Sequence, residues 1–163
     1  MRDLKAVQPD EMKVVRASDK HVPAVVQIAG EAGLSHWSFD DYILETCRHN
    51  SIFLVVEISP CYVIGFIVGR IVPGVSNSES LTSEIYNIAV IPDFRKRGIG
   101  SKLLSNFIQI SSSCGVGEVI LEVRGQNVRA RKFYASHGFK PCGERKGFYL
   151  DPADHAIIMK SML

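Results

Sequence analysis

The chain carries the sequence EIYNIAVIPDFRKRGIGSKLL at residues 84–104. Its first part is an apolar run that predicts a β-strand over residues 84–91. Its last part keeps apolar residues at helical spacing, which predicts an amphipathic helix over residues 99–112. Basic residues and glycines fill the turn between these two elements. The stretch therefore predicts a strand, a tight turn and a helix, a unit typical of α/β folds.

The turn at residues 95–100 has the composition of an anion-binding site. A helix that begins near Ile99 leaves its first backbone N–H groups without partners inside the helix, at the positive end of the helix dipole. Gly98 and Gly100 let a phosphate approach the backbone closely, and three basic side chains add charge. We expect a pyrophosphate here, and the alternative is a solvated basic turn. The P-loop and G-x-G-x-x-G patterns are absent, which argues against ATP and NAD.

The rest of the chain alternates strand and helix patterns. We predict strands at residues 12–17, 52–58, 62–72 and 119–123, two closing strands after residue 138, and helices after Ser18 or Asp19, after Ser38 and at residues 128–137. The strands on either side of residues 59–61 are expected to pair antiparallel through a short turn. This order predicts an α/β sandwich with a mixed sheet.

The helix predicted after Ser38 has a clear start. The hydroxyl of Ser38 can accept a free N–H of the first turn, and Asp40 and Asp41 suit the helix dipole there. The predicted apolar face consists of Phe39, Tyr42, Ile43 and Cys47. We expect this helix to pack through that face.

Length and composition are those of one globular domain. The chain has 163 residues, of which 46% are hydrophobic and 22% charged, and both fractions are near the average for globular proteins. We expect a single domain over residues 1–163, with residues 1–11 as a flexible N-terminal extension. A monomer is the default expectation.

Several classes of partner and cofactor are not expected. The net charge is only +2 and the basic residues form no long run, which argues against nucleic acid. No apolar stretch reaches the ~20 residues that span a bilayer, and the first residues do not resemble a secretory signal. We therefore expect a cytoplasmic protein. The 4 cysteines are scattered without metal-ligand spacing, so we expect neither a metal nor disulfides.

Glu122 stands inside an apolar run at residues 119–123. We interpret this run as a buried central strand, where a carboxylate is unfavourable unless it is paired or hydrated. Partial burial should raise its pKa toward the range useful for accepting a proton from an ammonium group. Glu122 is the predicted general base. The alternatives are a structural ion pair of Glu122 with Arg124 or Arg129, and Glu84, expected to be more exposed, as the base.

Tyr134 lies on the apolar face of the helix predicted at residues 128–137. Its ring can pack there while its hydroxyl reaches a polar centre, and a phenol can donate a proton. A lone tyrosine on a helix is more often a core residue than a catalyst. Both interpretations are open on these residues alone.

Taken together, these features resemble the GNAT acetyltransferase superfamily. The resemblance rests on the strand at residues 85–90, the R-x-x-G-x-G turn, Leu121-Glu122-Val123-Arg124, Asn127 and Phe133-Tyr134, and it spans roughly residues 84–159. Residues 86–90, Phe139 and the closing residues 154–159 look most like the RimI branch, which acetylates the N-terminal alanine of a small-subunit ribosomal protein. The resemblance implies a mixed, mostly antiparallel central sheet flanked by about four helices, with splayed central strands.

The resemblance also implies acetyl-coenzyme A as cosubstrate and a role for each matching residue. Ile88, Ala89 and Val90 would bind the acetyl group and the pantetheine arm, and the pyrophosphate and coenzyme would be held by Arg95, Lys96, Arg97, Gly98, Ile99, Gly100, Ser101 and Asn127. Glu122 would accept the proton of the incoming amine, and Tyr134 would protonate the leaving thiolate. Trp37 and Tyr149 would contact the acceptor, which is expected to be a protein N-terminus.

The acceptor side departs from the RimI pattern. His36 replaces a proline, Ile91 replaces an acidic residue, and the predicted loop at residues 73–83 is long. A lysine side chain or a small-molecule amine is therefore an alternative acceptor. A non-catalytic module that binds coenzyme A is a further alternative.

Overall fold

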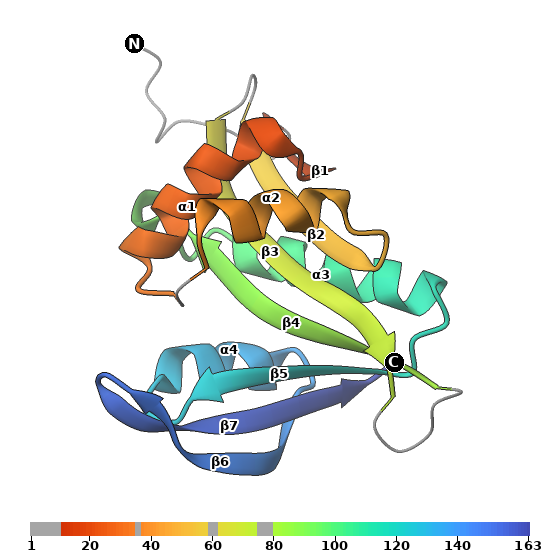
Figure 1. Cartoon of the computed structure of the whole chain (residues 1–163), viewed down its shortest axis with the longest axis vertical. Coiled ribbons are helices and arrows are strands. Elements are labelled where there is room, and N and C mark those ends of the chain that lie inside the picture. The colour runs from red at the N-terminus through yellow and green to blue at the C-terminus, as the bar shows by residue number, and fades with distance from the viewer. Residues whose placement is uncertain (1–10, 35–36, 59–61, 75–79) are drawn as a thin grey trace. The chain divides into compact units, whose positions relative to one another are not determined.

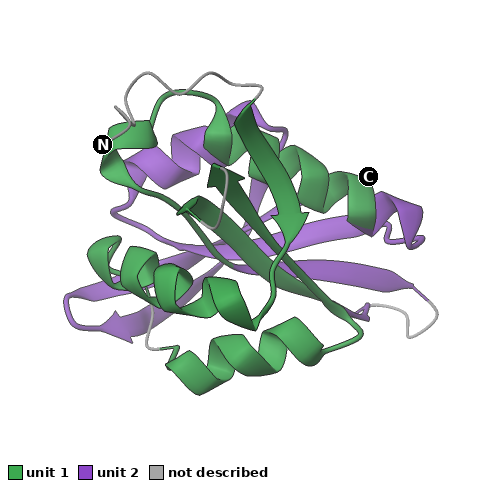
Figure 2. Cartoon of the chain, turned by 90° about the horizontal axis from the view of Figure 1, so that it is seen from above, with its two compact units in different colours: residues 1–70, 87–110 green, residues 71–86, 111–163 purple. Residues whose placement is uncertain are grey.

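The computed structural model describes residues 11–34, 37–58, 62–74 and 80–163. The chain forms two compact units (Figure 2). The first unit comprises Met1–Arg70 and Asn87–Ile110, and the second comprises Ile71–Tyr86 and Ser111–Leu163. Of the predicted N-terminal extension only Glu11 is described, and His36 and the predicted turn at residues 59–61 lie outside the described residues.

The elements follow the predicted order (Figure 1): β1 (Met12–Arg16), η3 (Asp19–His21), α1 (Val22–Glu31), α2 (Phe39–Cys47), β2 (Ser51–Ile58), β3 (Tyr62–Pro73), β4 (Leu81–Val90), η4 (Pro92–Phe94), α3 (Ile99–Ser113), β5 (Glu118–Arg124), α4 (Val128–Ser136), β6 (Lys140–Leu150) and β7 (Ala153–Met162). The strand order is β1-β2-β3-β4-β5-β7-β6. β4 and β5 pair parallel, whereas β1–β2, β2–β3, β5–β7 and β6–β7 pair antiparallel. The predicted mixed, mostly antiparallel sheet is confirmed. None of the described helices is long and apolar enough to cross a bilayer.

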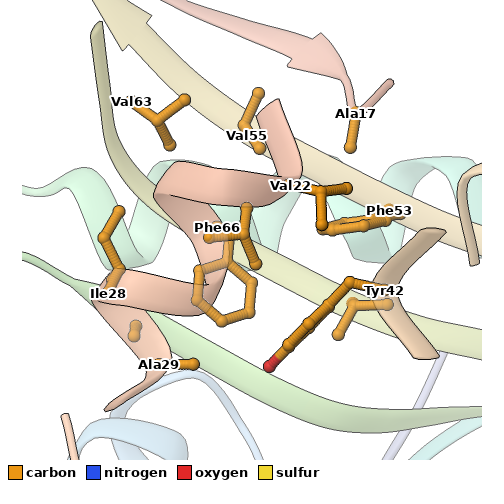
Figure 3. Close-up of a cluster of buried hydrophobic side chains, with 12 residues drawn as sticks. Ala17, Val22, Ile28, Ala29, Tyr42, Phe53, Val55, Val63 and Phe66 are labelled. Carbon is orange, nitrogen blue, oxygen red and sulfur yellow. The ribbon is translucent and has the colours of Figure 1, made fainter. Parts of the chain in front are cut away.

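The first unit has a core of buried apolar side chains (Figure 3). α1 contributes Val22 and Ile28, α2 contributes Tyr42, and strands β2 and β3 contribute Phe53 and Phe66. The rings of Tyr42 and Phe66 meet edge to face with centroids 5.8 Å apart. Because each buried side chain of this size contributes about 1.5–3 kcal/mol, these contacts hold α1 and α2 against the strands.

Helix α2 begins as predicted, but only part of its predicted apolar face is buried. The Asp41 N–H donates to the Ser38 hydroxyl (3.2 Å), and the Ser38 N–H donates to the Asp41 carboxylate (2.7 Å), so the two residues cap the helix. Tyr42 and Ile43 pack into the core as predicted, whereas Phe39 and Cys47 are exposed, which contradicts their part of the predicted apolar face. At about 100° per residue, Cys47 lies roughly 140° around the helix from the buried Tyr42. The sequence therefore predicts where α2 begins, but it does not predict correctly which of its residues are buried.

A charged residue completes the buried face of α2. Glu45 is 1% exposed, and Arg70 of β3 donates from Nε to its two carboxylate oxygens at 3.0 and 3.1 Å. Arg70 Nη2 and Arg48 Nε also contact Glu45. Two guanidinium groups thus compensate one buried carboxylate, which would otherwise be strongly unfavourable in this setting. The cluster ties α2 to β3 within the first unit.

Strands β3 and β4 approach closely at Gly65. A Cβ at this position would lie 2.8 Å from the carbonyl oxygen of Ala89, closer than real Cβ contacts. One residue earlier in β3, the Ile64 carbonyl accepts the N–H of Ile91 at 3.0 Å. Glycine therefore lets β3 lie directly against the end of β4.

The second unit contains the short parallel ladder between β4 and β5. The ladder runs from Thr82↔Glu118 to Ile85↔Leu121. Tyr86 and Glu122 come next in their strands and are not part of this ladder. β5 continues to pair with β7 as far as Arg124. β6 pairs with β7 through two shifts of register and forms an edge of the sheet.

Candidate active site

The basic turn lies in the first unit, between η4 and α3. The backbone takes positive φ values at Lys96 (61°) and Gly98 (78°), so the chain turns sharply before the helix begins. The first helical bond runs from the Lys102 N–H to the Gly98 carbonyl (2.9 Å). The amides of Ile99 and Gly100 therefore have no acceptor within the helix. An anion at the start of α3 would meet these two amides, so the predicted anion site stays a prediction.

The basic side chains of the turn have different surroundings. Arg95 is half-buried and donates from Nε to the carbonyl of Val90 at 2.9 Å, which fixes the turn to the end of β4. The guanidinium of Arg97 lies 4.9 Å from the ring centroid of Phe94. Lys96 is exposed. The exposed cations, Lys96 and Arg97, are thus suited to an anionic ligand, while Arg95 mainly holds the turn in place.

The strand end predicted to bind the acetyl group, Ile88 to Val90, also lies in the first unit. Ala89 is buried, and Ile88 and Val90 are half-buried on the other side of β4. Trp37, predicted to contact the acceptor, is half-buried in this unit and packs on Tyr42, with ring centroids 5.2 Å apart. The first unit therefore holds the predicted coenzyme residues except Asn127, together with Trp37.

Glu122 is in the second unit and is exposed, which contradicts its predicted burial. Its neighbours Leu121 and Val123 are buried, so β5 alternates between a buried and an accessible face instead of being buried on both. The carboxylate of Glu122 accepts a hydrogen bond from Arg145 Nη1 at 2.9 Å. Neither Arg124 nor Arg129 takes this place.

Glu84, the second candidate for the base, also differs from expectation. It is half-buried in β4, and its carboxylate accepts a hydrogen bond from the Tyr86 hydroxyl at 2.7 Å. This hydrogen bond occupies one carboxylate oxygen. Glu84 is therefore less exposed than predicted and already has a proton donor beside it.

Tyr134 is buried in the second unit. Its ring packs against Phe133 and Phe139, with centroids 5.3 and 5.7 Å away. Burial, and to a smaller extent the nearby Tyr149, raises the pKa of the Tyr134 hydroxyl above its ordinary value. The hydroxyl stays protonated at neutral pH and can donate. The packing predicted for its ring is present.

Tyr149 and Asn127 complete the second unit's set of predicted residues. Tyr149 is half-buried, and the Arg124 guanidinium lies 4.0 Å from its ring centroid. Burial, followed by the negative charge of Glu122, raises the pKa of Tyr149. Asn127 caps α4: its Oδ1 accepts the Ala130 N–H at 3.0 Å, a bond that leaves the Nδ2 group for another partner. Tyr149 thus stands within electrostatic reach of both Glu122 and Tyr134.

Arg145 is the residue at this site that the sequence did not predict. Glu122 and Arg145 belong to β5 and β6, and β7 lies between those strands, with Ile158 paired to Glu122 and Ala156 paired to Arg145. That these two side chains are neighbours can be recognised only once the strand order is known. No group of three or more His, Cys, Asp or Glu in the described ranges is arranged to hold a metal ion.

Comparisons with known proteins agree with this fold. Residues 22–139 match the model of the Acetyltransferase (GNAT) family. The chain is 42% identical over 77 residues to the [ribosomal protein bS18]-alanine N-acetyltransferase of Salmonella typhimurium, which covers 46% of this chain and 52% of the relative. The chain thus spans about half the length of that relative. It is 27% identical over 159 residues to an N-alpha-acetyltransferase of Sulfolobus acidocaldarius, covering 94% and 92% of the two chains.

Solved structures show the same architecture. The ribosomal-protein-S18-alanine N-acetyltransferase of Escherichia coli superposes with a TM-score of 0.79 and 25% sequence identity, covering 93% of each chain. The predicted family and its fold are confirmed. The likeness to the RimI branch is confirmed as well. From the matched residues and the shared fold, the chain belongs to the GNAT acetyltransferase family.

Proposed function

We propose that this protein transfers the acetyl group of acetyl-coenzyme A to the α-amine of a protein N-terminus, with the N-terminal alanine of a small-subunit ribosomal protein as the leading candidate. The observation that carries the proposal is the second unit's combination of an accessible carboxylate, Glu122, with a buried phenol, Tyr134. A module that only binds coenzyme A needs neither group. An acceptor on the ribosome would put the reaction in the cytoplasm, the expected location.

The first unit supplies the proposed coenzyme contacts. The amides of Ile99 and Gly100, with the exposed Lys96 and Arg97, are suited to the pyrophosphate. The remaining proposed contacts come from Ile88, Ala89, Val90, Arg95, Gly98 and Ser101, and from Asn127 of the second unit through its Nδ2 group. Backbone N–H groups at residues 88–90 would stabilise the oxyanion that develops on the thioester carbonyl.

The proposed chemistry is direct transfer without a covalent enzyme intermediate. The acceptor loses a proton to Glu122, directly or through water, and the neutral amine attacks the thioester carbonyl. A C–N bond forms, the C–S bond breaks, and Tyr134 donates its proton to the leaving thiolate. Glu122 is exposed, and it would act through its position beside the incoming amine.

The acceptor assignment has two supports. The relatives of this chain include enzymes named for acetylating the alanine of ribosomal protein bS18 and an enzyme named as an N-alpha-acetyltransferase. The aromatic side chains of Trp37 and Tyr149 are half-buried, so each keeps a surface that a peptide can contact. Under this proposal both line the acceptor site.

The test is mass spectrometry of a peptide that begins with alanine and contains one internal lysine, incubated with acetyl-coenzyme A. Acetylation confined to the N-terminus supports the proposal. Transfer to the lysine, checked with a second peptide whose N-terminus is blocked, would move the acceptor to a side-chain amine. Coenzyme binding with no transfer to either peptide or to isolated ribosomal proteins would indicate a non-catalytic module.

The site assignment is tested by Glu122→Gln and Tyr134→Phe. Each should lower kcat by about 10²–10⁴-fold, the usual contribution of a general acid or base, while the affinity for coenzyme A stays unchanged. Glu118→Gln is a matched control, because Glu118 lies on the same strand and pairs with Thr82 and Lys160. If Glu122→Gln keeps the parent rate, the base is another residue, and Glu84→Gln is the next variant to measure.

A further inference from the structure

Arg145 and Glu122 share one hydrogen bond, and each side chain keeps polar atoms that a ligand could bind. The single hydrogen bond joins Arg145 Nη1 to Glu122 Oε1. Within the described part of the chain, Glu122 is the one hydrogen-bonding partner of Arg145. The side chains of Arg145 and Glu122 are 52% and 32% exposed. The second carboxylate oxygen and the other guanidinium nitrogens therefore remain available to a ligand.

Phe148 supports the guanidinium independently of Glu122. The Arg145 guanidinium lies 4.0 Å from the centroid of the Phe148 ring. A cation over an aromatic face gains roughly 0.5–1 kcal/mol at an exposed site. Arg145 can therefore stay in place when its carboxylate partner changes.

Arg124, the other arginine beside these residues, is engaged differently. Its two Nη groups donate to the backbone carbonyls of Pro152 (2.9 Å) and Asp151 (3.2 Å), and its guanidinium lies over Tyr149. These contacts hold the turn between β6 and β7. Arg145, by contrast, directs its hydrogen bond to a side-chain carboxylate at the accessible face of β5, which makes it the cation better suited to bind a ligand.

We propose that Arg145 is a specificity-determining residue that selects acceptors carrying a carboxylate next to the reacting amine, as in a protein whose second residue is Asp or Glu. The inference rests on the proposed role of Glu122. An incoming α-ammonium group competes with Arg145 for Glu122, and the exchange breaks a partly exposed ion pair, which costs little. Arg145 then lacks a carboxylate unless the acceptor brings one. Because Glu122 and Arg145 are in contact, that carboxylate must lie close to the amine.

The experiment compares three peptides that begin Ala-Glu, Ala-Gln and Ala-Lys and are otherwise identical. The parent enzyme should prefer Ala-Glu to Ala-Gln by about tenfold in kcat/KM, the usual scale for one charge pair at an interface. Ala-Lys should be the poorest acceptor, because its ammonium faces the guanidinium. Arg145→Gln should remove the preference, and Arg145→Lys should restore part of it.

Lys146→Gln is the matched control, because it removes one positive charge from the adjacent exposed position of β6. It should keep the preference for Ala-Glu. Equal kcat/KM values for Ala-Glu and Ala-Gln with the parent enzyme would overturn the role of Arg145 while leaving the proposed function intact. A preference that survives in Arg145→Gln would overturn it as well. No transfer by the parent enzyme to any peptide would instead overturn the proposed function.

Discussion

Asn87 donates a hydrogen bond from its side-chain amide to the hydroxyl of Tyr42 at 3.3 Å, and both residues are buried in the first unit. Tyr42 belongs to α2, and Asn87 directly precedes the strand end at residues 88–90 that we propose to bind the acetyl group. Polar groups inside an apolar cluster are unfavourable unless they pair. This bond therefore fixes how α2 packs against β4.

Tyr42→Phe should lower the free energy of unfolding by about 1–2 kcal/mol, because it removes one buried hydrogen bond while it keeps the ring. Urea denaturation followed by circular dichroism measures the change. Tyr62→Phe is the control: Tyr62 is exposed in β3, so the same substitution should alter stability by less than about 0.5 kcal/mol. Equal effects of the two substitutions would mean that the bond to Asn87 does not contribute.

Stability should fall at alkaline pH in a way that depends on Tyr42. Burial raises the pKa of Tyr42 to about 12, whereas a tyrosine in the unfolded chain titrates near 10. Between these values the unfolded chain has lost the proton that the folded chain keeps, so the free energy of unfolding falls as the pH rises. The contribution of Tyr42 to the free energy of unfolding is complete below about pH 10 and is lost above about pH 12.

The measurement is a pair of urea denaturation series, for the parent and for Tyr42→Phe, between about pH 9 and pH 12. The parent should lose roughly 1–2 kcal/mol more than the variant, because solvent screening reduces the full effect of the pKa shift. The other tyrosines titrate in both proteins and cancel in the comparison. If the free energies of unfolding of the two proteins fall in parallel as the pH rises, Tyr42 has the same pKa in the folded and the unfolded chain.

Gly65→Ala should destabilise the protein and weaken coenzyme binding. The new Cβ would lie 2.8 Å from the Ala89 carbonyl oxygen, and backbone cannot yield as a flexible side chain can. We expect a loss of about 1–3 kcal/mol, as for other overpacked sites, and a higher Kd for coenzyme A by calorimetry. Gly30→Ala should instead stabilise by about 0.5–1 kcal/mol, because α1 has open space there. If Gly65→Ala leaves both quantities unchanged, β3 does not constrain the end of β4.

Glu45→Gln should lower stability more than any other single carboxylate-to-amide change in α1 or α2. The substitution leaves Arg70 and Arg48 without the charge that they neutralise, and we expect a loss of about 2–4 kcal/mol for an ion pair that is buried at one end. Thermal unfolding provides the readout. The control is Glu31→Gln, whose carboxylate is exposed and accepts a hydrogen bond from Gln27. A similar melting temperature for both variants would contradict the proposed role of Glu45.

The sequence predicted the elements well because their ends carry local signals. Ser38 caps α2 through a hydroxyl that acts within three residues, and Gly33 adopts a positive φ of 62° just after α1. Strands β2 and β3 can likewise be told apart in the sequence, because turn residues separate two β-rich runs. Such signals depend on neighbours along the chain, which a sequence displays directly.

The burial of charged residues was harder to predict because it depends on contacts between distant segments. Glu122 was assigned to a buried strand, yet only one face of β5 is covered, and its partner Arg145 is 23 positions away across β7. Glu45 carried no signal of burial, because its partner Arg70 is 25 positions away. The role proposed for Glu122 came from its place in an apolar run and from the family resemblance, whereas the sequence alone left the role of Tyr134 open until the resemblance was considered. Both roles stay predictions until the variants are measured.

The two shifts of register in β6 have a consequence for how the protein behaves in concentrated solution. A regular edge strand offers its unpaired backbone groups to another chain, which is a common route to aggregation. β6 interrupts its own pairing between Pro141 and Gly143 and again between Arg145 and Tyr149, and it carries Lys140 and Lys146 on its exposed length. A neighbouring molecule that tried to add a strand here would meet a proline, an irregular backbone and repelling charges. The β6 edge is therefore protected against pairing with a strand of another molecule.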